Sequence, residues 1–137
     1  MLRRIVLALD DSEESARAVD VACQLARGSD ASVTVLHVRN KKVSCCGEPW
    51  ETPMGCIPDE LVARAVIVLR SAGVDARARL AHRAGRPAFA ILDVAADQEA
   101  DLVIAGWHPR HPMGGLLEKS TGQKLTDAAD RPLLLVP

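Results

Sequence analysis

Aromatic side chains and net charge are both scarce in this chain of 137 residues. Aromatic residues make up 2%, with no tyrosine, and 17 basic residues face 18 acidic ones, which leaves a formal charge of −1. Proteins that bind single-stranded nucleic acids stack bases on aromatic rings, and those that bind duplexes or anionic membranes carry an excess of basic side chains. We therefore expect neither a nucleic acid nor a membrane surface to be the main partner.

Long apolar runs are missing as well. The run Ile5–Leu9 near the start is too short for a signal peptide, since Asp10 and Asp11 follow it directly. No later run reaches the ~20 apolar residues that a membrane-spanning helix needs. We therefore expect a cytoplasmic protein.

The four cysteines lack the spacing of a disulfide framework or of a zinc site. Cys23 falls on a helical pattern, whereas Cys45, Cys46 and Cys56 share one segment rich in proline and glycine. Adjacent cysteines are poor ligands for a single ion, and no neighbouring cation clearly activates a thiol here. We expect free thiols and assign no metal, and the role of Cys45, Cys46 and Cys56 stays open.

Hydrophobic residues make up 48% of the chain, enough for one globular domain over residues 1–137. Apolar runs typical of buried strands alternate with amphipathic segments typical of helices. Strands are predicted over 5–9, 32–38, 74–81, 101–105 and 132–136. Helices are predicted after Ser12 as far as Gly28, from Pro58 to Gly73, from Pro87 onward and over 116–130. This alternation predicts a parallel sheet with helices on both faces.

Three of these elements carry finer signals. In the first helix Ser12 can cap the N-terminus. The face expected to pack on the core carries Ala16, Val19, Cys23 and Ala26. The strand over 74–81 alternates apolar and charged residues, so we expect it to be solvated on one face and to lie near an edge of the sheet. The last strand is apolar throughout and would leave an unprotected edge.

In a sheet of this kind, ligands bind beyond the carboxyl ends of the strands, where the strand order reverses. Asp10 follows the first strand, Val38 ends the second, and Gly106 follows the fourth. The segment 105–121 then runs from a glycine turn towards a helix with a Ser–Thr pair, as phosphate-binding loops do. We therefore expect an anionic ligand at this edge.

Five segments carry a pattern that can be compared with known families. They are Ile5–Ser15, Val35–Val38, Ala84–Pro87, Ala100–Gly106 and Arg131–Pro137. In this order and spacing they resemble the universal stress protein family, and the resemblance covers the whole chain. Together with the alternation of elements, it predicts an α/β three-layer sandwich that is Rossmann-like. Its five-stranded parallel sheet has the order 3-2-1-4-5, with helices on both faces.

ATP-binding members of that family carry a glycine, two residues, a second glycine, nine residues and then Gly-Ser or Gly-Thr. On this chain the pattern falls on Gly106, Pro109, Lys119 and Ser120, so two of the three glycines are replaced. Proline has no N–H to offer a phosphate, and lysine disfavours positive φ. The ammonium of Lys119 and the neighbouring Thr121 could still hold phosphate. Binding of ATP with Mg²⁺ and a vestigial phosphate loop therefore both stay open.

The resemblance also implies a site for a nucleoside. Asp10 would accept hydrogen bonds from the ribose or the adenine side, and Ala8 and Val38 would form an apolar slot for the base. Asp10 could equally be a helix cap. The candidate binding residues are Ala8, Leu9, Asp10, Val38, Ala105, Gly106, Lys119, Ser120 and Thr121. No catalytic residue is assigned.

The first functional hypothesis is a cytoplasmic stress-response protein that binds or senses ATP or AMP with little catalysis. The alternative is a nucleotide-free dimeric module of the same family, whose regulatory protein partner recognises the segment 39–57. A slow ATPase, with His108 or His111 near the terminal phosphate, has the least support. The resemblance and the apolar last strand predict a homodimer through Leu133–Val136.

Overall fold

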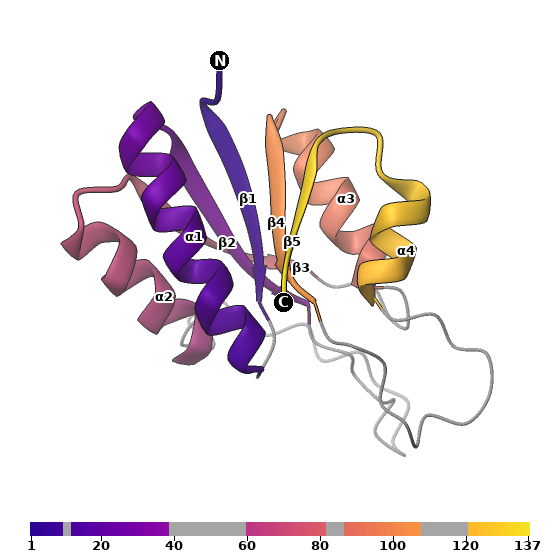
Figure 1. Ribbon diagram of the computed structural model, residues 1–137, viewed down its shortest axis with the longest axis horizontal. Helices are drawn as coiled ribbons and strands as arrows, with labels where there is room; N and C mark the ends of the chain where they lie inside the picture. The colour runs from indigo at the N-terminus through magenta and orange to yellow at the C-terminus, as the bar shows by residue number, and fades with distance from the viewer. Residues whose placement is uncertain (10–11, 39–59, 82–86, 108–120) are drawn as a thin grey trace.

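The computed structural model describes residues 1–9, 12–38, 60–81, 87–107 and 121–137 (Figure 1). Strands and helices alternate along these ranges, as the apolar pattern predicted. The strands are β1 (Arg4–Leu9), β2 (Ser32–Val38), β3 (Ala76–Ala81), β4 (Leu102–Gly106) and β5 (Leu133–Val136). The helices are α1 (Glu13–Ser29), α2 (Glu60–Ser71), α3 (Pro87–Asp97) and α4 (Thr121–Ala128). The predicted helical residues 116–120 lie outside the described ranges.

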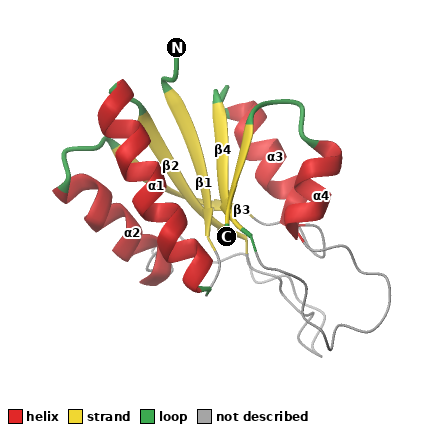
Figure 2. Cartoon of the chain, viewed as in Figure 1, coloured by secondary structure: helices red, strands yellow, loops and turns green. Residues whose placement is uncertain are grey.

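The five strands form one sheet in the order β3-β2-β1-β4-β5, and every neighbouring pair is parallel. This confirms the predicted strand order. Helices α1 and α2 lie on one face and α3 and α4 on the other, so the sheet forms the middle of three layers (Figures 1 and 2). The edge position of β3 is confirmed too, although the strand begins at Ala76, two residues later than predicted.

The position of β1 in the middle of the sheet explains why its sequence is apolar without interruption. Side chains of a strand alternate between the two faces, and here each face is covered by helices. Ile5, Leu7 and Leu9 pack in the core beneath α1 and α2, whereas Val6 and Ala8 pack in the core beneath α3 and α4. The sheet therefore separates two apolar cores.

Helix α1 begins as the sequence indicates. The side-chain oxygen of Ser12 accepts a hydrogen bond from the Ser15 N–H at 3.2 Å, which caps the first turn. Of the predicted inward residues, Val19 and Ala26 are buried and Cys23 is half-buried, but Ala16 is exposed. The buried residues of α1 are Ser15, Ala18, Val19, Ala22 and Ala26. Ser15 replaces Ala16 as the inward residue of the first turn, and it shares one helix face with Ala18, Val19 and Ala22, which lie three, four and seven residues further on.

The predicted end of α1 at Gly28 is wrong. The helix continues to Ser29 and is capped by Asp30, which adopts the left-handed conformation with φ of 58°. The Asp30 N–H donates to the Ala26 carbonyl. Aspartate tolerates this conformation better than most residues, so the chain ends the helix without a glycine at the cap. Gly28 is an ordinary helical position with open space around it.

Candidate functional site

The carboxyl ends of β1, β2 and β4 meet at one edge of the sheet, which is the edge the sequence predicted for a ligand. From β1 the chain first builds one side of the sheet with β2 and β3. It then returns to the other side of β1 for β4 and β5. The strand order therefore reverses between β1 and β4, the place where doubly wound sheets bind ligands. At that point Ala8 pairs with Ala105, and Leu9 pairs with His37.

The structure describes six of the nine predicted binding residues, two of them by backbone alone. Ala8 and Ala105 are neighbours on the α3–α4 face, where their small side chains belong to the same core. Leu9 points to the opposite face and packs beneath α1 and α2, so its side chain is not beside Ala8. Val38 ends β2, and Thr121 begins α4. Asp10, Lys119 and Ser120 lie outside the described residues, as does Pro109.

Gly106 lies against the first turn of α1. A Cβ added at Gly106 would lie 2.9 Å from the Glu14 carbonyl carbon and 2.9 Å from the Ser15 nitrogen. Both are backbone atoms, which cannot move aside as a flexible side chain can. A glycine at this position therefore allows β4 to approach α1 closely, the same requirement that fixes one glycine of dinucleotide-binding folds.

Helices α1 and α4 follow the two strands beside the reversal, β1 and β4, and their first turns differ in charge. The first turn of α1 carries Glu13 and Glu14, and the Ser12 side chain already occupies the Ser15 N–H. The negative charge of this turn disfavours a phosphate, although Arg17 lies 3.6 Å from the Glu14 carboxylate. The first turn of α4 carries no acidic residue. Of these two described helix starts, that of α4 is the one whose charge suits an anion.

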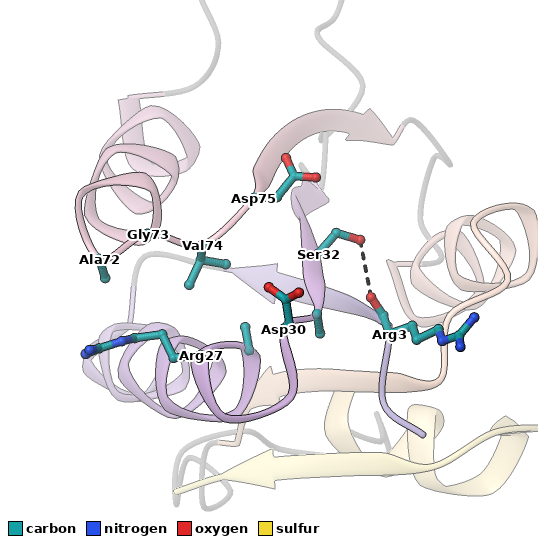
Figure 3. Close-up of a pocket in the computed structure, with 10 residues that line it drawn as sticks. Arg3, Arg27, Asp30, Ser32, Ala72, Gly73, Val74 and Asp75 are labelled. Carbon is teal, nitrogen blue, oxygen red and sulfur yellow. Dashed lines mark hydrogen bonds between the residues drawn. The ribbon is translucent and has the colours of Figure 1, made fainter.

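A hollow of about 500 Å³ lies at the opposite, amino edge of the sheet (Figure 3). Its walls come from the end of α1, the start of β2 and the turn before β3. Arg3 and Arg27 point away from each other, and Asp30 lies between them (Figure 3). The lining thus mixes both signs of charge without converging donors, and it lies away from the edge where parallel sheets bind ligands. We do not assign a ligand site to it.

The carboxyl groups whose pKa is lowered among the described residues also belong to the amino edge. The Arg3 and Arg4 N–H groups donate to one oxygen of Asp101 at 2.8 and 2.9 Å, and these bonds lower the pKa of that carboxyl. A hydrogen bond from Arg79 lowers the pKa of Asp97, which links β3 to α3. These interactions join chain segments and indicate structural rather than catalytic roles.

The Asp101 bonds predict a pH dependence of stability. A carboxyl whose folded pKa lies below its unfolded value stabilises the fold above about pH 4, and this contribution is lost as the pH falls through the folded pKa. Asp101→Asn keeps an acceptor oxygen but removes the charge. We expect the variant to unfold at lower urea concentration than the parent at pH 7, and the difference to shrink below about pH 3.

Urea titrations followed by circular dichroism at several pH values measure this effect. Asp20→Asn, on the exposed polar face of α1, is the matched control. A difference between Asp101→Asn and the parent that stays constant down to the acid transition would contradict the assignment.

Metal ligands do not cluster in the part of the chain that the structure describes: no group of three or more His, Cys, Asp or Glu residues converges there. Cys23 is a free, half-buried thiol of α1. The predictions for Cys45, Cys46, Cys56, His108 and His111 concern residues outside the described ranges. Within the described residues, no helix is both long and apolar enough to cross a membrane.

The fold and its carboxyl edge define a doubly wound, Rossmann-like α/β protein. A family model for the universal stress protein family matches residues 1–137. The chain therefore belongs to the universal stress protein family. It is 31% identical, over 137 residues and 99% of each chain, to the "universal stress protein in QAH/OAS sulfhydrylase 3′ region" of Thermus aquaticus.

Solved structures of the family have the same fold. A universal stress protein crystallised in complex with cAMP superposes with a TM-score of 0.74 and 23% identity, over 98% of this chain and 96% of that one. The Archaeoglobus fulgidus universal stress protein in complex with dAMP gives a TM-score of 0.68 and 21% identity, over 100% of this chain and 98% of that one.

Proposed function

We propose that this protein binds an adenine nucleotide, ATP or AMP, at the carboxyl edge of β1, β2 and β4, with little catalysis. The observation that carries the proposal is the reversal of strand order beside the paired residues Ala8 and Ala105. Relatives of the same fold were crystallised with cAMP and with dAMP, which supports an adenine nucleotide as the class of ligand. The role is that of a cytoplasmic stress-response protein that senses the nucleotide.

The residues at this edge divide into two groups. Ala8, Leu9 through its backbone, Asp10 and Val38 would hold the nucleoside, with Ala8 and Val38 as the apolar slot for the base. Ala105, Gly106, Lys119, Ser120 and Thr121 would hold the phosphates. The acid-free first turn of α4 fits this second role, whereas the two glutamates of α1 keep phosphate away from that helix. If ATP is bound, Mg²⁺ would neutralise part of its charge.

The close contact between Gly106 and α1 explains the glycine at this position without any ligand. Its retention therefore adds little weight to phosphate binding. Binding of the phosphates would depend more on Lys119, whose ammonium would replace by charge what the missing glycines supply through backbone N–H groups.

The second candidate is a nucleotide-free dimeric module with a vestigial phosphate loop. It is favoured by β5, where Leu133, Leu134 and Leu135 are only partly buried at the end of the sheet. The opposite edge strand, β3, carries Arg77 and Arg79, which discourage pairing with a second sheet. A homodimer through Leu133–Val136 is proposed under either candidate, and the regulatory partner of the segment 39–57 belongs to the second.

Calorimetric titration of ATP and AMP into nucleotide-free protein, with and without Mg²⁺, separates the two candidates. Micromolar binding supports the nucleotide sensor, and no heat of binding at millimolar ligand supports the second candidate. Light scattering on the same samples gives the molar mass and tests the dimer.

Asp10→Ala is the informative variant for the nucleoside half of the site. We expect it to weaken ATP binding by about 10- to 100-fold, since hydrogen bonds to a charged acceptor contribute ~1.5–3 kcal/mol, with little change in the melting temperature. Asp20→Ala, on the exposed face of α1, is the control and should bind as the parent does. Equal affinity in Asp10→Ala and the parent would remove Asp10 from the site.

A further inference from the structure

Helix α4 is too short to be stable alone, so its position depends on tertiary contacts. It has 8 residues, whereas isolated helices in water need about 12 to 15. One contact is Leu125, which is fully buried in the core shared with α3. The other lies in the first turn, at Gly122, which is also buried.

Gly122 provides the space for the ring of Trp107. A Cβ added at Gly122 would lie 2.8 Å from Trp107 Cδ1 and 3.8 Å from Leu135 Cδ1. The first distance is shorter than real side chains tolerate, so the indole lies directly on the helix backbone. A tryptophan and a glycine 15 positions apart form no sequence pattern that would link them.

Trp107 is held in turn by the sheet. It follows directly after β4, and its backbone N–H donates to the carbonyl of Val136 at 2.7 Å. Its side chain remains 40% exposed. Backbone and ring together thus join the ends of β4 and β5 to the first turn of α4, beside Gly106 at the carboxyl edge.

We propose that Trp107 is a positioning residue that clamps the first turn of α4 to the carboxyl edge of the sheet. Through this contact it sets where the phosphates of a nucleotide can bind. The second statement rests on the proposed function, whereas the clamp itself does not. Because the Trp107 ring contacts α4 through Gly122, a side chain at position 122 and the indole compete for one volume.

This competition predicts that Gly122→Ala changes the melting temperature in opposite directions with and without the Trp107 ring. Gly122→Ala should lower the melting temperature by several degrees when Trp107 is present. In a Trp107→Ala background the same substitution should raise it by about 2 to 4 °C, because alanine is the better helix former and the space is free. Gly28→Ala in α1 meets nothing within 4 Å and should raise the melting temperature in both backgrounds. A Gly122→Ala effect of the same sign and size in both backgrounds would overturn the clamp.

Fluorescence reports the ring directly. The chain has two tryptophans, so Trp50→Phe leaves Trp107 as the single emitter. In that chain Gly122→Ala should shift the emission to longer wavelength as the indole is displaced into water. An unchanged spectrum would mean that the ring does not rest on Gly122.

The affinities for ATP and for adenosine, which lacks phosphate, test whether Trp107 positions the phosphate-binding part of the site. Trp107→Leu should weaken ATP binding by about tenfold and adenosine binding by less than about twofold, since α4 would be displaced only at the phosphate end. Equal losses for both ligands would overturn the positioning role and indicate general destabilisation. If the parent binds neither ligand, the proposed function and the link to phosphate both fail, while the melting experiment still decides the clamp.

Discussion

Replacing Gly106 by alanine is expected to lower the free energy of unfolding by about 2 to 3 kcal/mol, within the range for forcing a methyl group into a packed interior. The added Cβ would lie 2.9 Å from two backbone atoms of Glu14 and Ser15. Relief requires β4 or the first turn of α1 to move, and both are fixed by other contacts. Urea unfolding followed by circular dichroism measures the loss.

Gly28→Ala is the matched control, since it makes the same chemical change in α1 where no atom lies within 4 Å. It should raise the free energy of unfolding by about 0.5 to 1 kcal/mol, the ordinary advantage of alanine in a helix. If Gly106→Ala proved as harmless as Gly28→Ala, the close approach of β4 to α1 would be wrong.

The explanation for Gly106 changes how the glycine pattern of the chain is understood. In the family motif Gly106 is the one glycine that this sequence retains, and it would be natural to take it as a remnant of phosphate binding. Its contact with α1 means that the fold alone requires it. A chain that had lost its nucleotide would still keep this residue, so the functional question rests on Asp10, Lys119 and Ser120.

The layer arrangement could be predicted because it follows from local patterns, and the strand order because the family resemblance implies it. Ile5–Leu9 is apolar at every position, as a strand covered on both faces must be, whereas β3 alternates with arginines, as an edge strand does. Right-handed connections between parallel strands leave few ways to assemble such elements. The carboxyl edge then follows from topology, whereas the register that pairs Ala8 with Ala105 was learned from the structure.

Contacts between distant residues could not be predicted in this way. Ser15 is buried because Gly106 packs against it, and no local signal distinguishes Ser15 from Ala16 as the inward residue. Likewise, Gly28 was the better candidate for the end of α1 by residue type, yet Asp30 takes the left-handed position. Residue type ranks the candidates for the capping position, but it does not fix which of two nearby residues takes it.

Arg131 is expected to be the polar side chain on which β5 depends most. Its Nη1 donates to the carbonyls of Ala95 at 2.9 Å and Ala100 at 3.0 Å, and its side chain is only 18% exposed. The Ala95 carbonyl also accepts the Ala100 N–H, so it keeps one bond without the arginine. The Ala100 carbonyl has the arginine as its partner, and losing it leaves a buried acceptor unpaired. Arg131→Met should therefore lower the free energy of unfolding by about 2 kcal/mol.

The matched control is Arg64→Met in α2, where the arginine pairs with Glu60 but is 75% exposed. Its loss should change stability by less than about 0.5 kcal/mol, as for other solvated pairs four residues apart on a helix. Hydrogen exchange adds a spatial test: in Arg131→Met the amides of β5 should exchange faster while those of β1 and β2 keep their protection, because the arginine joins the end of α3 to the start of β5. Equal losses of stability in the two variants would mean that the Ala95 and Ala100 bonds contribute no more than a surface ion pair.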